Sequence, residues 1–450
     1  MPMTDPNDLT RQPIPQLIRN LAIPASTGYF FNTMYNVVDT YFGGLISTQV
    51  LAALSLSLPV FFIILATGTG LSTGATALIA NAMGAGQRDE ARLLATQGLT
   101  FGLLISIFLT FLGWFASPLL FRALGASDAY LVTSLIYMRT IFLGTVFFML
   151  NYMLNAILNA AGDTRSFRNF LMAGFFLNIM LDPWFIYGGL GLPALGVIGI
   201  ALATVLIQLA GVVYLGIKVS RTGLVSARSM RDYLPRRGPF KDIATQGFPA
   251  SLNMMTVGIG IFVITFFISA FGKEAVAAYG VAMRVEQIVL IPTIGLNVAT
   301  LAIVAQNNGA GFFDRVRQVL GKALKYGAWV MTAGTLLVFI LARPLMTFFT
   351  EDREVIGIGT TYLMIDALVL YAYVILFVNV AALQGVKRPM FAVWIGLGRQ
   401  IVAPVILFYL LTHVFDWGLL GVWWGIFFIT WGAAVFSLFY ARRVLSRLSL

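Results

Sequence analysis

The sequence contains no cysteine, a single histidine (His413), and only 10% charged residues among its 450. Without cysteine there are no disulfides and no thiolate metal sites, and one histidine excludes a multi-histidine metal centre. No Gly-x-x-x-x-Gly-Lys-Ser/Thr loop is present, so we expect no ATP-driven cycle and no nucleotide cofactor. The sequence also lacks the catalytic constellation that an enzyme needs, so we expect no enzymatic activity.

Hydrophobic residues make up 59% of the chain. Long apolar runs in such a composition indicate membrane spans, each long enough to cross a core of about 30 Å. The continuous runs do not alternate as barrel strands do, so we predict an all-α membrane protein. About twelve spans are expected, at 17–42, 50–80, 93–116, 130–160, 169–188, 195–217, 244–270, 276–305, 326–343, 356–384, 391–412 and 419–440.

The net charge of +11 favours nucleic acid at first sight, but in a membrane protein basic residues gather on the cytoplasmic side. With the N-terminus inside, 22 of the 29 lysines and arginines fall on inside segments. We therefore expect both termini in the cytoplasm and no nucleic-acid partner. The stretch 1–20 carries no apolar core of the signal-peptide type, so we expect no cleaved targeting segment.

The chain repeats itself at a constant offset. Residues 24–86 align without a gap onto 249–311 with 18 identities in 63 positions. Each unit holds six spans, so both begin on the same side and form two six-helix lobes related by a pseudo-two-fold axis along the membrane normal. The expected divisions are an N-lobe at 1–217, a basic cytoplasmic linker at 218–243, and a C-lobe at 244–450.

An acid and a proline mark the first span. Asp39 lies near its outer end, and a carboxylate in hydrocarbon costs several kcal/mol, so it predicts a functional site. Pro24 lies near the start of the span and removes a backbone hydrogen bond, which makes the helix bendable. We interpret the pair as a switch, in which an acid takes up a cation on a helix that can kink.

Further polar residues are expected at the depth of Asp39. Asp182 and Asn178 share one face of the fifth span, as Tyr35 and Asp39 share one face of the first. Asn36 is within reach of that face, and Thr204 of the sixth span lies at comparable depth. Two carboxylates with amide, hydroxyl and phenol oxygens can share a proton, or ligate a monovalent cation at Asp182, Asn178 and Asp39. The alternative is a structural hydrogen-bond network.

A polar stripe on the fourth span consists of Asn151, Asn155 and Asn159. We favour hydrogen bonding between helices over substrate contact for the stripe. We assign three side chains to a substrate cavity, namely Asn32, Asn155 and Met34. Methionine suits such a cavity because its side chain adapts to varied ligands.

Several motifs together resemble the multidrug and toxic compound extrusion (MATE) family over about residues 15–440. They are Pro-Ala-Ser at 24–26 and 249–251, Asn36-Val37-Val38-Asp39, Gly84-Ala85-Gly86 followed by Arg88, the segment 158–165, and Leu383-Gln384-Gly385. Within the family the chain is similar to the DinF-like branch. The NorM-like branch carries acids in helices 7 and 10, whereas 248–270 has none here.

The resemblance implies a multidrug efflux antiporter of the prokaryotic inner membrane that confers antibiotic resistance. It implies export of amphipathic, often cationic drugs and toxins in exchange for H⁺ or Na⁺, with the Asp39 cluster as the coupling site and Pro24 as the bending point. We expect a monomer in the lipid bilayer without a cofactor. The alternatives are a lipid-linked saccharide flippase of the same superfamily, which would favour a more cationic cavity, and an integral membrane lipid-modifying enzyme.

Overall fold

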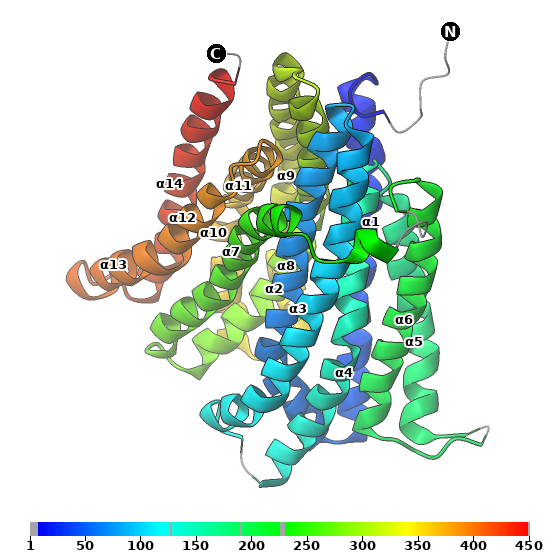
Figure 1. Ribbon diagram of the computed structural model, residues 1–450. Coiled ribbons are helices and arrows are strands. Elements are labelled where there is room, and N and C mark those ends of the chain that lie inside the picture. Colours follow the sequence, from blue (N-terminus) through cyan, green and yellow to red (C-terminus); the bar gives the residue numbers. More distant parts are fainter. Residues whose placement is uncertain (1–7, 127, 190, 226–229, 449–450) are drawn as a thin grey trace. The chain divides into compact units, whose positions relative to one another are not determined.

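The computed structural model describes residues 8–126, 128–189, 191–225 and 230–448. These residues form helices joined by short turns, with one isolated bridge between Gly189 and Leu192 and no strand among them (Figure 1). The all-α prediction is confirmed. The helices group into two compact units, Thr27–Ser251, here called unit 1, and Leu9–Ser26 together with Leu252–Leu450, here called unit 2.

Unit 1 contains five complete α-helices, one short 3₁₀ helix, and parts of two more α-helices. They are the second part of α1 (Ile14–Ile46), then α2 (Thr48–Gly84), α3 (Arg88–Ala123), α4 (Asp128–Ala160), α5 (Arg165–Tyr187), α6 (Val197–Arg221), the short η1 (Met230–Tyr233) and the first part of α7 (Arg237–Ser269). Helix α4 packs against α2, α3 and α6, and α5 packs against α6 (Figure 1). Aliphatic and aromatic side chains of α2 and α4 fill the centre of this unit.

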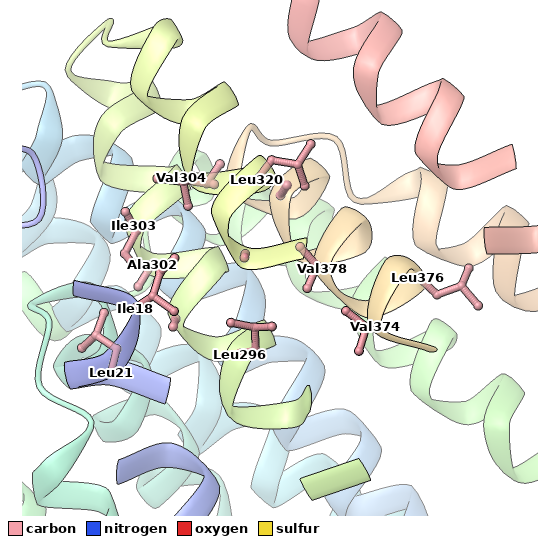
Figure 2. Close-up of a cluster of buried hydrophobic side chains, with 14 of the residues drawn as sticks. Ile18, Leu21, Leu296, Ala302, Ile303, Val304, Leu320, Val374, Leu376 and Val378 are labelled. Atoms are coloured by element: carbon pink, nitrogen blue, oxygen red, sulfur yellow. The ribbon is translucent and has the colours of Figure 1, made fainter. Parts of the chain in front are cut away.

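Unit 2 contains the first part of α1, the second part of α7, and the remaining helices. They are α8 (Lys273–Gly309), α9 (Phe313–Phe349), α10 (Arg353–Ala367), α11 (Leu370–Gly385), α12 (Met390–Leu397), the π-helical turn η2 (Gly398–Val402), α13 (Ala403–Tyr409), the π-helical turn η3 (Leu410–Val414) and α14 (Gly418–Ser446). Helices α10 and α11 form one span bent by 51°. Figure 2 shows Ile18 and Leu21 of α1 beside Leu296 and Ala302 of α8, within the largest apolar cluster of this unit.

The expected spans correspond to these helices in order. Ten of the described helices are long and apolar enough to cross a membrane, and the bent α10–α11 pair makes eleven. The remaining expected span is α1, which at 33 residues is long enough. Asparagines, threonines and Asp39 interrupt its apolar run, so composition alone does not single it out.

The repeat is visible in the packing as well as in the sequence. The units divide after Ser26 in α1 and after Ser251 in α7, which are equivalent positions of the two repeats. A Cβ on Gly295 would overlap Ser26, and a Cβ on Gly70 would overlap Ser251, so glycine allows the same close helix crossing in each unit. Each first helix of a repeat therefore begins in one unit and continues in the other, and the units depart from the expected lobe ranges at these two helices.

The basic linker contacts α3. The buried Gln97 side chain donates to the carbonyl oxygens of Asp232 and Leu234 at 2.6 and 2.8 Å, and accepts from the Arg236 backbone N–H at 2.8 Å. One polar side chain thus satisfies three backbone groups of η1 and of the turn that follows it. The linker residue Arg228 lies outside the described residues.

Candidate functional site

The Asp39 cluster lies within unit 1, between the second part of α1 and helices α5 and α6. The amide of Asn178 on α5 donates to Oδ1 of Asp39 at 2.9 Å. One turn before Asp39, the Tyr35 hydroxyl donates to Oγ1 of Thr204 on α6 at 3.1 Å. The structure therefore brings together four of the residues that the sequence placed at one depth, and two hydrogen bonds join α1 to its neighbours.

Asp182 is the most unusual member of the cluster. It follows Asn178 by one helical turn, is 0% exposed, and neither of its carboxylate oxygens accepts a hydrogen bond from the described residues. The Asp39 carboxyl is its charged neighbour. Oδ1 of Asn178 is likewise buried without a donor. A buried carboxylate without donors is unfavourable, so three buried oxygens here are suited to a proton or a small cation.

Two glycines let the helices approach closely enough to form this cluster. A Cβ on Gly174 of α5 would lie 3.2 Å from the Ile207 side chain of α6 and 4.0 Å from the Tyr35 ring. A Cβ on Gly199 of α6 would lie 2.7 Å from the backbone carbonyl carbon of Phe185 on α5. Small residues at such crossings are what permits close packing of membrane helices.

Tyr137 belongs to the cluster but was not identified from the sequence. It lies on α4, is 8% exposed, and its phenol is close enough to interact with both Asp39 and Asp182. It is one of sixteen tyrosines, and no local pattern distinguishes it. Only the packing of α4 against α6 and α2 brings its hydroxyl to the acids.

Three other predicted side chains of α1 are placed differently. The Asn36 amide donates to the carbonyl of Asn32 at 2.9 Å, so it bonds its own helix rather than Asp39. Asn36 and Asn32 are exposed and Met34 is half-buried. The structure does not bring Asn36 into the hydrogen bonds of the cluster.

The asparagine stripe of α4 faces the interior of unit 1. The Asn151 amide donates to the backbone and side-chain oxygens of Gln208 on α6, at 2.8 and 2.7 Å, which is the predicted bond between helices. Asn155 is 5% exposed, and its Oδ1 accepts no hydrogen bond from the described residues. Asn155 thus remains a candidate for contact with a ligand.

Pro24 is buried within α1, which runs through it as one helix. Because proline has no N–H, the carbonyl of Asn20 loses its partner in the helix. The boundary between the two units falls two residues later, after Ser26. The weakest point of the α1 backbone thus lies within one turn of the place where its packing partners change.

A second pair of acids lies in unit 2, where Glu286 is half-buried and Asp366 is buried. Glu286 of α8 accepts from the Tyr362 hydroxyl at 2.9 Å, and Asp366 of α10 is 3% exposed with an unpartnered Oδ1. Asp366 lies at the break between α10 and α11, and Glu286 is its charged neighbour. Arg284 of α8, two residues before Glu286, is exposed and forms no ion pair with the described residues.

No group of three or more histidine, cysteine or acidic side chains that could hold a metal occurs within the described part of the chain. The carboxyls of both clusters instead occur in pairs, surrounded by phenol and amide groups. Such pairs suit monovalent ions better than Ca²⁺ or Mg²⁺, which take six or more oxygen ligands.

Comparison with known proteins identifies the family. The MatE family model matches the chain twice, over residues 24–184 and 249–414, so that the two matches begin at equivalent positions of the repeat. The chain belongs to the MATE family. It is a multi-pass membrane transporter of the multidrug efflux type and not an enzyme, and the twofold match agrees with the internal repeat.

Individual relatives span nearly the whole chain. A probable multidrug resistance protein, YoeA, of Bacillus subtilis is 29% identical over 85% of this chain and 83% of its own. A probable multidrug resistance protein, NorM, of Thermotoga maritima is 27% identical over 93% of this chain and 91% of its own. A solved outward-facing multidrug resistance MATE family transporter of the MOP superfamily superposes with a TM-score of 0.92, at 28% identity over 99% of both chains.

Proposed function

We propose that this transporter is a monomeric antiporter of the DinF-like branch, located in the inner membrane with both termini in the cytoplasm. It exports amphipathic, often cationic drugs in exchange for H⁺, with Na⁺ as the alternative coupling ion. The observation that carries the proposal is the Asp182 carboxyl, buried without a hydrogen-bond donor beside the Asp39–Asn178 pair. A protein keeps such a costly group in a membrane helix when its charge state changes during function.

The coupling ion would be exchanged at the two carboxyls. A proton on either acid removes one of two neighbouring buried negative charges and provides a donor for one of the three unpartnered oxygens. A sodium ion at Asp39, Asp182 and Oδ1 of Asn178 would neutralise the same charge by ligation. In both cases loading the site changes what Asp39 can bond to on α1, which is the helix that carries the proline.

Bending of α1 at Pro24 would connect the loaded site to export. Asp39 lies fifteen residues after Pro24, about 22 Å along the helix. The first part of α1 packs in unit 2 and the second part packs in unit 1. A change at Asp39 that shifts the second part of the helix would therefore be taken up where the backbone already lacks a hydrogen bond.

The flippase alternative would favour free arginines in the spans for a pyrophosphate group. Two of the arginines within the spans, Arg139 and Arg399, lie against aromatic rings of their own unit instead. The guanidinium carbon of Arg139 is 4.9 Å from the ring centroid of Trp114, and that of Arg399 is 5.6 Å from that of Tyr373. Such stacked arginines favour a structural role, which supports the drug antiporter over the flippase.

The proposal is tested by drug efflux from proteoliposomes under an imposed proton gradient or an imposed sodium gradient. We expect the proton gradient alone to drive uphill transport, and Asp39→Asn and Asp182→Asn each to abolish it. Glu351→Gln is the matched control, because Glu351 is an exposed acid of the same chain outside both clusters.

Transport by the sodium gradient alone would assign the site to Na⁺. Uphill transport that survives Asp39→Asn and Asp182→Asn would contradict the proposed coupling site. Translocation of a lipid-linked saccharide without drug efflux would favour the flippase.

A further inference from the structure

A cavity of about 760 Å³ lies entirely within unit 2, between the first part of α1 and helices α8 and α9. This volume is in the range of pockets that bind small molecules. Its walls are mainly apolar and include Ile23 of α1, Leu296 of α8, and Trp329 and Val330 of α9. Figure 2 shows Leu296 beside Ile18 and Leu21 at this meeting of α1 with α8.

The charged side chain in the lining of the cavity is Arg19, and Lys322 and Lys325 of α9 are outside that lining. Arg19 is exposed and forms no ion pair with the described residues. The Arg315 guanidinium of α9 donates to the Gln12 carbonyl at 2.8 Å, which sets the register of the two segments. Arg19 lies seven residues after Gln12, and Lys322 lies seven residues after Arg315. Both segments run from the predicted cytoplasmic side outward, so Arg19 and Lys322 lie at similar depth. Lys325 lies one turn deeper on α9.

The other end of the cavity faces the surroundings of a membrane span. Trp329 is 67% exposed and Ile23 is 58% exposed, and the two side chains lie on α9 and α1. Trp329 follows Lys325 by four residues and therefore shares its helix face. The cavity is thus an amphipathic groove, with cations toward the predicted cytoplasmic side and an indole and aliphatic side chains toward the hydrocarbon.

We propose that an anionic phospholipid of the cytoplasmic leaflet binds in this cavity. Its phosphate binds Arg19 and Lys322, and an acyl chain lies along Ile23, Leu296 and Trp329. Arginine binds phosphate through paired N–H groups, and basic pockets between membrane helices hold anionic head groups. The unpaired cations repel a cationic drug, and a soluble anion would gain nothing from the apolar wall, so the charge and the wall together select a lipid.

The position of the site gives the lipid a structural effect. The cavity is lined by Ala22 and Ile23 before Pro24 and by Ser26 after it. A bound lipid therefore contacts α1 on both sides of the proline and holds its first part against α8 and α9. An effect on helix bending rests on the proposed function, whereas binding itself does not.

The proposal is tested with the purified full chain by native mass spectrometry, titrating phosphatidylglycerol or phosphatidylcholine with identical acyl chains. We expect phosphatidylglycerol to bind more tightly, and Arg19→Gln to weaken it about tenfold without changing the binding of phosphatidylcholine. Val330→Trp, which fills the apolar end but keeps every charge, should weaken both lipids. Arg442→Gln is the control, because Arg442 is an exposed cation at the same predicted membrane surface.

Thermal unfolding of each variant, followed in the same detergent, shows whether it is folded, and Lys322→Gln replaces Arg19→Gln if the latter is not. Equal affinity for the two lipids, or phosphatidylglycerol binding that survives both charge substitutions, would overturn the proposal. Competition by soluble glycerol phosphate at the affinity of the lipid would assign the site to a soluble anion, and so would also overturn it.

Discussion

Replacing Asp39 by asparagine separates the charge of the proposed coupling site from its shape. The side chain of Asp39→Asn keeps an oxygen that can accept from Asn178, whose amide lies 2.9 Å from Oδ1 in the native protein. The change turns a hydrogen bond to a charged group into a neutral one, which costs about 1–2 kcal/mol. It also removes one of two neighbouring buried acids, which offsets part of that cost. We therefore expect a folded variant.

The effect on substrate binding follows from competition between drug and proton. If the drug binds the form in which one proton has left the cluster, its affinity falls by up to tenfold for each unit that the pH drops. The wild-type Kd should then be larger at pH 6 than at pH 8, by up to about 100-fold. The direction of this pH dependence follows from the proposal, because at low pH protons occupy the site and exclude the drug. Asp39→Asn should reduce the ratio to about twofold or less.

The assay is equilibrium binding of a fluorescent cationic dye to purified protein at pH 6 and pH 8, in sodium-free buffer. Glu351→Gln should keep the wild-type ratio. Equal wild-type affinities at the two pH values, with export intact in the absence of sodium, would refute proton competition. Binding that depends on sodium at constant pH would instead favour a cation held by Asn178 and Asp182.

Four further substitutions test other parts of the structure. Pro24→Ala should keep dye binding but lose uphill export from proteoliposomes, whereas Pro249→Ala, at the equivalent place in α7, should leave the pH dependence of binding unchanged. Gly295→Ala should lower the free energy of unfolding by about 1–3 kcal/mol, measured by thermal unfolding in detergent, because its Cβ would overlap α1 at Ser26. Tyr362→Phe should lower it by about 1–3 kcal/mol, because Glu286 loses its donor at 2.9 Å, and an unchanged stability would contradict that role.

The spans could be predicted because each is a continuous apolar run of sufficient length. The expected limits of the second span, 50–80, lie inside those of α2 (Thr48–Gly84), and similar agreement holds along the chain. The repeat could be predicted for the same reason, since gapless identities at one offset survive in the sequence. Pairings within a helix, such as Tyr35 with Asp39, follow from the helical period alone.

Features that arise from packing between distant helices could not be predicted. Nothing in Ala367-Leu368-Val369-Leu370 marks the 51° break in the span of α10 and α11, because the segment contains neither proline nor glycine. Tyr137 joins the acids only through the packing of α4. The pairing of Glu286 with Tyr362 was also missed, since their relative depth depends on how α8 lies against α10.

The two halves of the repeat share a backbone plan but place their acids differently. At the constant offset of the repeat, Asp39 of α1 corresponds to Ile264 of α7, and Glu286 of α8 corresponds to Phe61 of α2. Each unit nevertheless holds one buried and one half-buried carboxyl with a phenol nearby. In unit 1, Asp39 lies on α1, which also carries Pro24 near the unit boundary, whereas Asp182 lies on α5. Under the proposed function, an ion at the unit 1 pair would act on α1 directly, whereas an ion at the pair in unit 2 would act through α8 and the bent α10–α11 pair.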